Sequence, residues 1–365
     1  MENQDNQNQK KEINEIQDTI IPIPQTPEKA TEEEFYSTLK LLAPGTAFRT
    51  ALDGALKIGK GALIAIENEA LIPLMDGGFR VNCRFTPQRL MELTKMDGAI
   101  ILSKDLKRIT HANVLLTPES KIKSLETGTR HKAAERTAKQ ISGLVVAISE
   151  RRHEINIFYK NIRHTLKNTE EILRKVNEQV QLIEKQRELF DKNVEKLNKL
   201  ELKNYPSLHQ AVIVLQKGKM IQKIGEGMKK YLVELGSEGT LQKIRLKEIT
   251  SGIDKEVNLI IKDYTRLDMK KSKTLIDTLT YDEILDAENM LRVLAYEKAI
   301  QLNPIKGWRL LSRTQLHEQD IATIIKHTGS LGKALYAKDV DYNTLLGDEK
   351  AIHLMEEIEK IKMNQ

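Results

Sequence analysis

The sequence contains one cysteine, Cys83, in 365 residues. A single thiol excludes a disulfide within the chain, and with no second cysteine nearby a structural zinc site is not expected. We therefore expect Cys83 to be a small buried or half-buried side chain. Aromatic residues are also scarce, at 4% of the chain, which suits a helix-rich protein with cores of Leu, Ile and Val.

The sequence has no apolar run approaching the roughly 20 residues that span a bilayer, and its N-terminus is polar rather than signal-like. We therefore expect a cytoplasmic protein without a membrane partner. It also lacks a strong excess of one charge, because the formal net charge of +6 permits a polyanionic partner without requiring one. The length is sufficient for two or three domains, each with its own core.

Composition and pattern change along the chain. Residues 1–31 are rich in Asn, Gln, Lys and Glu and are interrupted by prolines, which predicts a disordered polar tail. From residue 32 to 164, short β-rich runs such as GALIAI, GAIILS and GLVVAIS alternate with helical segments. Several of these runs are apolar throughout, as in strands whose sheet is covered by helices on both faces. We predict an α/β domain here.

Residues 165–300 have a helical pattern and predict a helical stalk. Apolar residues recur at steps of three and four on one long helix, with Thr169 and Arg187 as exceptions: Leu166, Leu173, Val176, Val180, Ile183, Phe190, Val194 and Leu197. Further helices are predicted at about 207–235, 238–266 and 281–300. The lysine-rich patches QKGKMIQKIGEGMKK and MKKSK are more simply a solvated surface than a DNA-binding face. Residues 301–365 form a small terminal segment of short helices.

The stretch TGTRHKAAERTAKQ, residues 127–140, places Arg130, His131 and Lys132 at the start of a predicted helix. Acidic residues are usual there, because the aligned peptide dipoles leave partial positive charge at that end. Thr127 or Thr129 is a candidate N-cap beside Gly128. Cations at this position become favourable when an anion binds, and phosphate is the anion that such helix starts most often receive. A solvated basic turn explains this stretch alone equally well.

The stretch LTKMDGAIILS, residues 93–103, predicts a helix that ends at Met96, a turn at Asp97 and Gly98, and a strand that begins at Ala99. A lone aspartate in such a turn is more often only a turn former. Together, however, MDGAIILS, ETGTRHKAAERTAKQ and VVAISERR resemble the diadenylate cyclase domain of the DNA integrity scanning family, bacterial enzymes that make cyclic di-AMP. YLVELGSEGTLQKIRL resembles the helical middle of that family, and GWRLLSRTQL resembles the start of its C-terminal helix-hairpin-helix module.

The resemblance implies a multidomain fold of α/β and all-α parts. An N-terminal diadenylate cyclase domain, with a mixed sheet flanked by helices, would occupy residues 32–164. A helical linker or stalk would follow over 165–300, and a small helix-hairpin-helix-like domain over 301–365. The implied reaction condenses two ATP into cyclic di-AMP with loss of two pyrophosphates, using Mg²⁺ or Mn²⁺. Each site would hold one ATP, so two subunits would have to face each other, and the family assembles such pairs into homo-octamers.

The resemblance also assigns residues. Asp97 matches the carboxylate that helps to bind the metal and activates the 3′-hydroxyl, and Arg130 and His131 match catalytic phosphate-binding residues. Glu150 is a candidate second metal carboxylate or an ordinary acid at a strand end. The ATP-binding set implied is Gly98, Ala99, Leu116, Gly128, Thr129, Arg130, His131, Lys132 and Ser149, with Leu116 at the adenine. These residue types suit the implied reaction, because attack on an α-phosphate needs cations, a metal and a carboxylate near the nucleophile.

The sequence departs from the family at two places. The family motif has arginine where this chain has Lys132, which keeps the charge but loses the two-pronged fork, so we expect retained activity with weaker ATP handling. In LLGDEKAIHLMEEI the second hairpin has only Gly347 and is about two residues short, so binding of branched DNA, and with it nucleoid association, has less support than the cyclase. Candidate DNA contacts are Lys306, Arg309, Arg313 and Gly347, while Trp308 is expected to be a packing anchor and His317 a surface residue. The alternative is a DNA-binding scaffold oligomer with a weakened or inactive cyclase site.

Overall fold

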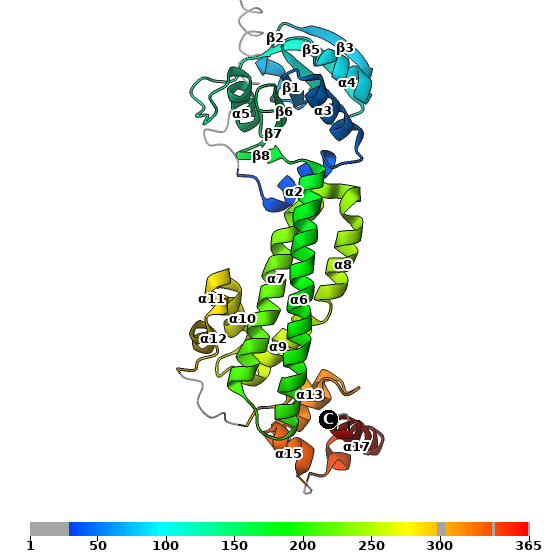
Figure 1. Cartoon of the computed structure of the whole chain (residues 1–365), viewed down its shortest axis with the longest axis vertical. Coiled ribbons are helices and arrows are strands. Elements are labelled where there is room, and N and C mark those ends of the chain that lie inside the picture. Colours follow the sequence, from blue (N-terminus) through cyan, green and yellow to red (C-terminus); the bar gives the residue numbers. More distant parts are fainter. Residues whose placement is uncertain (1–28, 298–303, 338–339, 364–365) are drawn as a thin grey trace, which may run out of the picture. The chain divides into compact units, whose positions relative to one another are not determined.

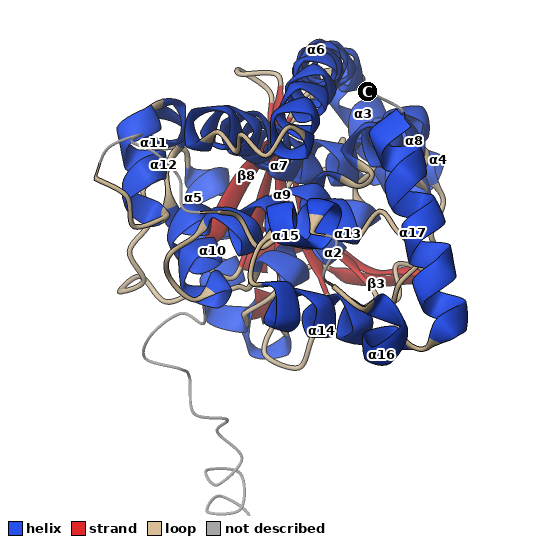
Figure 2. Ribbon diagram, turned by 90° about the horizontal axis from the view of Figure 1, so that it is seen from below, coloured by secondary structure: helices blue, strands red, loops and turns tan. Residues whose placement is uncertain are grey.

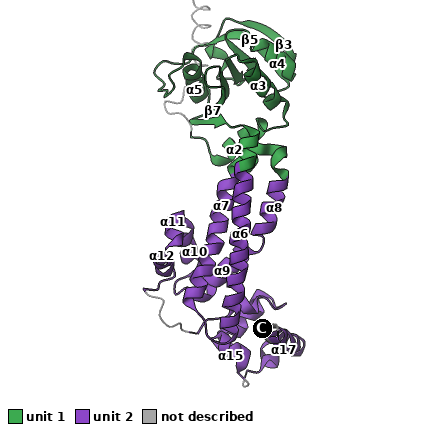
Figure 3. Ribbon diagram, in the orientation of Figure 1, with its two compact units in different colours: residues 1–174, 230–240 green, residues 175–229, 241–365 purple. Residues whose placement is uncertain are grey.

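The computed structural model describes residues 29–297, 304–337 and 340–363 (Figure 1). Nearly all of the tail predicted over 1–31 lies outside these residues. The chain divides into two compact units, the first comprising residues 1–174 with 230–240 and the second residues 175–229 with 241–365 (Figure 3). All strands of the described residues belong to the first unit, and the second unit is helical (Figure 2). None of the helices described has the length and apolar character that crossing a membrane requires.

The first unit is built on an eight-stranded mixed sheet, as predicted. Its strand order is β2-β5-β4-β1-β6-β7-β8, and β3 pairs with β5. Strands β1 and β4 are parallel, and the other neighbours are antiparallel. The strands are β1 (Ala62–Ile66), β2 (Met75–Asp76), β3 (Phe79–Arg84), β4 (Ala99–Leu102), β5 (Arg108–Leu116), β6 (Leu144–Ser149), β7 (Glu154–Tyr159) and β8 (Ile162–Leu166).

Helices cover both faces of the central strands, which explains why these strands are apolar throughout. On one face α3 (Ala47–Ile58) packs Phe48 and Leu52 into a core with Ile64 of β1 and Val146 of β6. On the other, α5 (Thr129–Ile141) packs small residues into a core with β1, β4, β6 and β7. The remaining helices of this unit are α2 (Glu32–Leu41), η1 (Ile72–Leu74), α4 (Pro87–Leu93) and η2 (Gly236–Gly239).

The sequence placed the end of the helix before Asp97 at Met96, but α4 ends three residues earlier, at Leu93. The N–H groups of Lys95 and Met96 reach back only three residues, to Glu92 and Leu93. These residues therefore form tight turns rather than a further turn of α-helix.

Helix α6 (Thr169–Leu202) is the long helix predicted from the apolar seam, and Val176, Val180, Ile183 and Phe190 are buried as the pattern requires. Leu166 is the exception, because it ends β8 instead of continuing the helix. Arg187 interrupts the seam because its guanidinium donates hydrogen bonds to the carbonyls of Ile249 and Ser251, at 2.6 and 2.8 Å.

The other helices of the second unit are shorter. They are α7 (Leu208–Leu235), whose last residues belong to the first unit, α8 (Thr240–Thr250), α9 (Ile253–Tyr264), α10 (Met269–Thr278), α11 (Tyr281–Leu285) and α12 (Ala287–Val293). The single helix predicted at 238–266 is wrong, because Gly252 adopts φ +77° and separates α8 from α9. The chain ends in α13 (Trp308–Leu311), α14 (Glu318–Thr328), α15 (Leu331–Tyr336), α16 (Tyr342–Leu346) and α17 (Asp348–Met363).

Candidate active site

The topology brings the predicted cyclase residues to one edge of the sheet. Asp97 and Gly98 directly precede β4, which is parallel to β1, while β5 and β6 run antiparallel to these two strands. Ala99 lies opposite Val114 near the end of β5, and Ala62 lies opposite Ile148 near the end of β6. The start of β4 and the ends of β5 and β6 therefore meet at the same edge, with Asp97, Leu116 and Ser149.

The turn before β4 is tightly packed. Gly98 has φ +85°, and a Cβ atom added there would lie 2.7 Å from the carbonyl carbon of Asn113. Only glycine fits this conformation and this close approach. The next residue, Ala99, is fully buried, whereas Asp97 is exposed. The turn thus fixes the Asp97 backbone on a rigid strand and leaves its carboxylate in solvent.

Helix α5 begins without a side-chain cap or an acid in its first turn. The N-cap is Gly128, and Thr129 is the first helical residue, so the prediction that Thr127 or Thr129 caps the helix is wrong. Gly128 offers no side-chain oxygen, and the first N–H groups of a helix have no partner within it. The start of α5 therefore presents backbone donors and the cations Arg130 and Lys132, which are half-buried.

Arg130 reaches the start of β1. A Cβ atom added at Gly61 would lie 2.0 Å from Nη1 of Arg130 and 3.3 Å from the carbonyl oxygen of Ile148. The guanidinium therefore lies against the Gly61 backbone, near the end of β6. Gly61 carries no signal of this role in the sequence, because no local pattern shows that a side chain from residue 130 passes over it.

His131 is held by β7. Its Nε2 lies 3.2 Å from Nδ2 of Asn156, and its ring meets Phe158 edge-on at 6.4 Å between centroids. Burial lowers the pKa of His131 below its ordinary value; the Glu126 carboxylate opposes this, and the positive charges of nearby arginines add to it. His131 is therefore a neutral imidazole near neutral pH.

The loop that leads into α5 is tied to the helix itself. The Glu135 carboxylate accepts hydrogen bonds from Ser124 Oγ at 2.5 Å, from the Leu125 N–H at 3.0 Å and from Lys139 Nζ at 2.7 Å. Burial alone would raise the pKa of Glu135, but the bonds from Lys139 and Ser124 hold it below its ordinary value. An ionised Glu135 thus fixes the backbone just before Gly128.

The remaining predicted ATP and metal residues also lie at this edge. Leu116 is buried and pairs with Met75 of β2. Ser149 ends β6 and accepts a hydrogen bond from the Arg152 N–H at 3.2 Å, and Glu150 follows it, exposed. No group of three or more His, Cys, Asp or Glu side chains within the described ranges forms a metal cluster. Mg²⁺ commonly takes one or two protein carboxylates together with phosphate oxygens, so the exposed carboxylate of Asp97 fits such an ion.

The predicted DNA contacts differ in their exposure. Lys306 and Gly347 are exposed, and Arg313 lies 3.6 Å from Glu256. Arg309 was predicted to contact DNA, and this is wrong, since its side chain is 0% exposed and forms ion pairs with Glu201 and Glu256. Its charge is already neutralised inside the second unit.

Trp308 and His317 lie as expected. The Trp308 ring is half-buried and carries the Lys262 ammonium at 3.2 Å from its centroid, so it serves as a packing anchor. His317 is exposed and precedes α14 as its N-cap residue.

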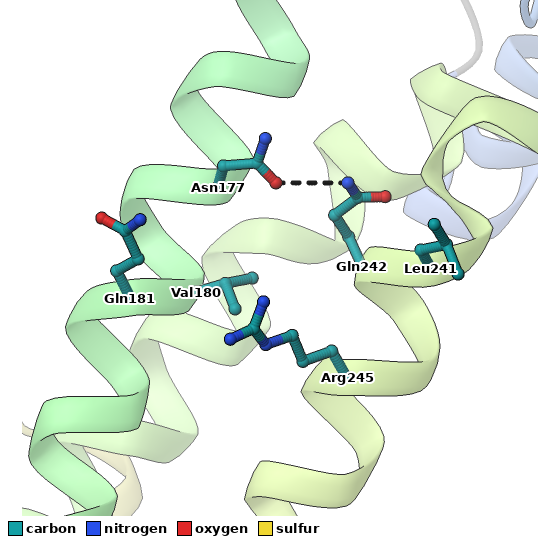
Figure 4. Close-up of a pocket in the computed structure, with 6 residues that line it drawn as sticks. All are labelled: Asn177, Val180, Gln181, Leu241, Gln242 and Arg245. Atoms are coloured by element: carbon teal, nitrogen blue, oxygen red, sulfur yellow. Dashed lines mark hydrogen bonds between the residues drawn. The ribbon is translucent and has the colours of Figure 1, made fainter.

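A cavity of about 320 Å³ lies in the second unit between α6 and α8. Figure 4 shows the Arg245 side chain extending from α8 toward Val180 of α6, below the 3.2 Å hydrogen bond between Gln242 and Asn177. Its lining combines aliphatic groups and amides with one guanidinium, and Arg245 is itself paired with Glu184. This cavity lacks the carboxylate and phosphate-binding groups gathered at the sheet edge.

Comparisons with known proteins bear on both units. The family model "DisA bacterial checkpoint controller nucleotide-binding" matches residues 49–162, and the model "DisA bacterial checkpoint controller linker region" matches residues 166–303. The DNA integrity scanning protein DisA of Acetivibrio thermocellus is 37% identical over 295 residues, covering 78% of this chain and 82% of its own. The DNA integrity scanning protein DisA of Clostridium acetobutylicum is 34% identical, and the match covers 91% of this chain and 95% of that protein. The one of Symbiobacterium thermophilum is 36% identical, and the match covers 90% of this chain and 96% of that protein.

The chain belongs to the DisA family. Its first unit carries the diadenylate cyclase domain of the DisA family, and the protein is a diadenylate cyclase. The resemblance carried by the MDGA and GTRHK stretches is thereby confirmed. The basic helix start and the aspartate turn, each ambiguous alone, belong to one nucleotide-binding domain.

Proposed function

We propose that the sheet edge with Asp97, Gly98 and the start of α5 is where this cyclase condenses two ATP into cyclic di-AMP and two pyrophosphates. The observation that carries the assignment is the meeting of two features. A carboxylate on a glycine turn and an acid-free, cationic helix start lie at the same edge of the sheet. These are the groups that nucleotidyl transfer to a 3′-hydroxyl requires.

The helix start binds the triphosphate of ATP in this proposal. The free N–H groups of α5 and the cations of Arg130 and Lys132 hold the phosphate oxygens, and Ser149 and Leu116 contact the nucleotide on either side. Asp97 orients the 3′-hydroxyl and accepts its proton as the oxygen bonds to the α-phosphorus. The bond from that phosphorus to pyrophosphate breaks, and Arg130 stabilises the charge on the leaving group. A Mg²⁺ or Mn²⁺ ion held by Asp97, with Glu150 as a second candidate ligand, would act as a Lewis acid on the phosphates.

The reaction requires two copies of the chain, since each site holds one ATP and the product contains two nucleotides. The surface around the site suits pairing: Leu115, beside Leu116, is 61% exposed, and Leu125, before Gly128, is 91% exposed. Apolar side chains of this size in solvent are typical of surfaces that meet a partner. When two such edges face each other, the 3′-hydroxyl of each ATP lies near the α-phosphate of the ATP in the other subunit. Assembly of these pairs into homo-octamers is proposed from the family resemblance.

A mixed pair of subunits tests this arrangement directly. Wild-type subunits are co-expressed with an excess of Asp97→Asn subunits carrying a second tag, and pairs holding both tags are purified. One functional carboxylate permits one phosphodiester bond, so we expect the linear dinucleotide pppApA to accumulate in place of the cyclic product. Cyclic product at half the wild-type rate with no linear species would show that one subunit completes both bonds, and would contradict the facing pair.

Contact of the C-terminal module with branched DNA is the second half of the proposal. With Arg309 buried, the exposed groups left for a DNA backbone are Lys306, the partly exposed Arg313 and the Gly347 turn. Asp348 and Glu349 follow Gly347 and repel phosphate. Mobility shift on a four-way junction across a salt series tests this separately from synthesis. Absence of binding at low salt would remove DNA from the proposal, while binding without cyclase activity would favour the scaffold alternative.

A further inference from the structure

We propose that Asn156, oriented by Thr165, is a positioning residue for the cyclase reaction, fixing the His131 ring with its Nδ1–H directed at the nucleotide phosphates. The inference rests on the function proposed above and extends it to two residues outside the recognised motifs. Asn156 lies on β7 and Thr165 on β8, so neither belongs to the sequence stretches that mark the site.

Asn156 is an exception within its strand. It lies in the middle of β7, in EINIFY, and is 1% exposed. It shares a face with Phe158, which packs into the core under α5, while Ile155 and Ile157 point to the opposite core. A buried amide costs free energy unless it is fully hydrogen-bonded, so an aliphatic side chain would be the ordinary occupant. The amide therefore needs partners, and it has two.

The amide has one partner at each of its ends. Thr165, directly opposite Asn156 on β8, donates its hydroxyl to Oδ1 at 2.7 Å. This leaves Nδ2 facing Nε2 of His131 at 3.2 Å. Because the amide nitrogen can only donate, Nε2 must accept, and the single ring proton of the neutral imidazole resides on Nδ1.

The Nδ1 atom faces the anion-binding end of α5. The Cβ position of Gly128, the N-cap residue, lies 3.7 Å from it. The Nδ1–H of His131, whose position Asn156 fixes, is thus a donor at the same end of α5 as the free backbone N–H groups. His131 adds a neutral, directional donor to the fixed charges of Arg130 and Lys132.

The charges around the ring maintain this state. Four groups from different elements act on His131: Arg130 of α5, Glu126 of the preceding loop, Arg152 of the β6–β7 turn and Arg163 of β8. The one carboxylate, Glu126, is buried and lies 2.7 Å from Arg163. It raises the pKa of His131, but burial of the ring, together with the three arginines, outweighs it, so the pKa stays below its ordinary value. Protonation of Nε2 would also place two donors against each other, since Nδ2 of Asn156 faces it. The Phe158 ring also packs against the imidazole in a T-shaped arrangement.

Three substitutions separate the orientation of the His131 ring from its protonation. Thr165→Val keeps the shape but frees the amide of Asn156 to rotate, and we expect kcat to fall roughly tenfold with a smaller change in KM, as when other functional histidines lose an orienting partner. Thr165→Ser restores the hydroxyl and should recover the rate. Asn156→Asp replaces the donor with a carboxylate, which favours the imidazolium. The pH midpoint of activity assigned to His131 should then rise by about one unit or more.

The matched control is Thr110→Val, which removes a strand hydroxyl bonded to the Ile101 carbonyl at 3.3 Å and to Nδ1 of His111 at 3.2 Å, neither of them a partner of His131. It should leave kcat and the pH profile unchanged. A second readout does not need turnover: affinity for 3′-deoxy-ATP, measured by calorimetry across pH, should show the same upward midpoint shift in Asn156→Asp. Folding of each variant is checked by its thermal transition.

The outcomes are separable. If wild-type protein makes no cyclic di-AMP but the binding midpoint shifts in Asn156→Asp, the proposed function fails and the placement of His131 beside phosphate stands. If wild-type protein is active while folded Thr165→Val and Asn156→Asp match it in rate, pH profile and binding midpoint, the positioning role is overturned. A rate loss that Thr165→Ser does not recover would also overturn it, because the hydroxyl would then not be the cause.

Discussion

The Arg309 guanidinium lies buried between the carboxylates of Glu201 and Glu256, and its Nη1 is 2.8 Å from Glu256. Asn198 accepts a further hydrogen bond at 2.5 Å. Removing the cation leaves Glu201 buried and unpaired, so Arg309→Met should lower the free energy of unfolding by about 3–5 kcal/mol. Urea denaturation measures this.

The exposed Lys306 provides the matched control. Lys306→Met should change stability by less than about 0.5 kcal/mol. If instead Arg309→Met left stability unchanged and weakened junction DNA binding, the buried ion pair would not be its role.

Asp263 gives the second unit a specific pH dependence. Its carboxylate accepts hydrogen bonds from the N–H groups of Gly307, Trp308 and Arg309 at 2.8–2.9 Å. Burial nevertheless raises the pKa of Asp263 to about 7, with the Glu201 charge adding to it. A raised carboxyl pKa means that the folded state retains the proton longer than the unfolded chain, whose pKa is near 3.8. The contribution of Asp263 to the free energy of unfolding is therefore fully present below about pH 4 and declines as pH rises toward 7.

The difference between wild type and Asp263→Asn isolates this group from the others that titrate. We expect the stability advantage of the wild type over the variant to shrink as pH rises from about 4 to about 7. Denaturant unfolding at several pH values measures it. An advantage that grows over this range would indicate an Asp263 held ionised by its three N–H donors.

Gly98 fixes the turn that carries Asp97. Gly98→Ala forces a Cβ into 2.7 Å contact with the Asn113 backbone at φ +85°. We expect a loss of about 1–3 kcal/mol in stability and a fall in kcat of at least roughly tenfold, because the carboxylate moves with the turn. The matched control is Gly227→Ala on α7, where an added Cβ meets nothing within 4 Å. That variant should be slightly stabilised and fully active. Equal activity of the two variants would show that the turn does not set the site.

Gly61 gives Arg130 its path to the sheet edge. A Cβ in Gly61→Ala would lie 2.0 Å from Nη1 of Arg130, and the flexible arginine has to move away. Because the displaced group is a side-chain end, the fold should be retained while KM for ATP rises roughly tenfold, the loss expected for one charge-assisted phosphate contact. Steady-state kinetics on protein with an unchanged thermal transition tests this. An unchanged KM would mean that Arg130 does not contact the nucleotide from this position.

Local signals made part of the molecule predictable. The apolar runs, the glycine turn before Ala99 and the charge of residues 130–132 each depend on neighbours in sequence, and they identified the strands, the Asp97 turn and α5. Contacts set by topology were not visible. Asn156 meets His131 only because α5 packs against β7, and Gly61 meets Arg130 only because the arginine side chain reaches from α5 to the start of β1.

The error at Arg309 has the same origin, whereas those at the helix ends come from local backbone conformation. Arg309 follows a tryptophan in a basic stretch and has the appearance of a surface residue, but its partners Glu201 and Glu256 lie 108 and 53 residues away. Gly252 separates α8 from α9 because it adopts a positive φ. A glycine inside a helical sequence pattern does not by itself predict such a break. Thr127 and Thr129 are both suited to capping, but the N-cap is Gly128, which lies between them.

The most direct measurement of the central claim is the product formed from ATP with Mg²⁺ or Mn²⁺, separated by chromatography, for wild type and Asp97→Asn. We expect cyclic di-AMP from the wild type and none from the variant, with both proteins folded and in the same oligomeric state. Wild-type protein that is folded and oligomeric yet makes no cyclic di-AMP with either metal would contradict it, as would an Asp97→Asn variant that retains full activity.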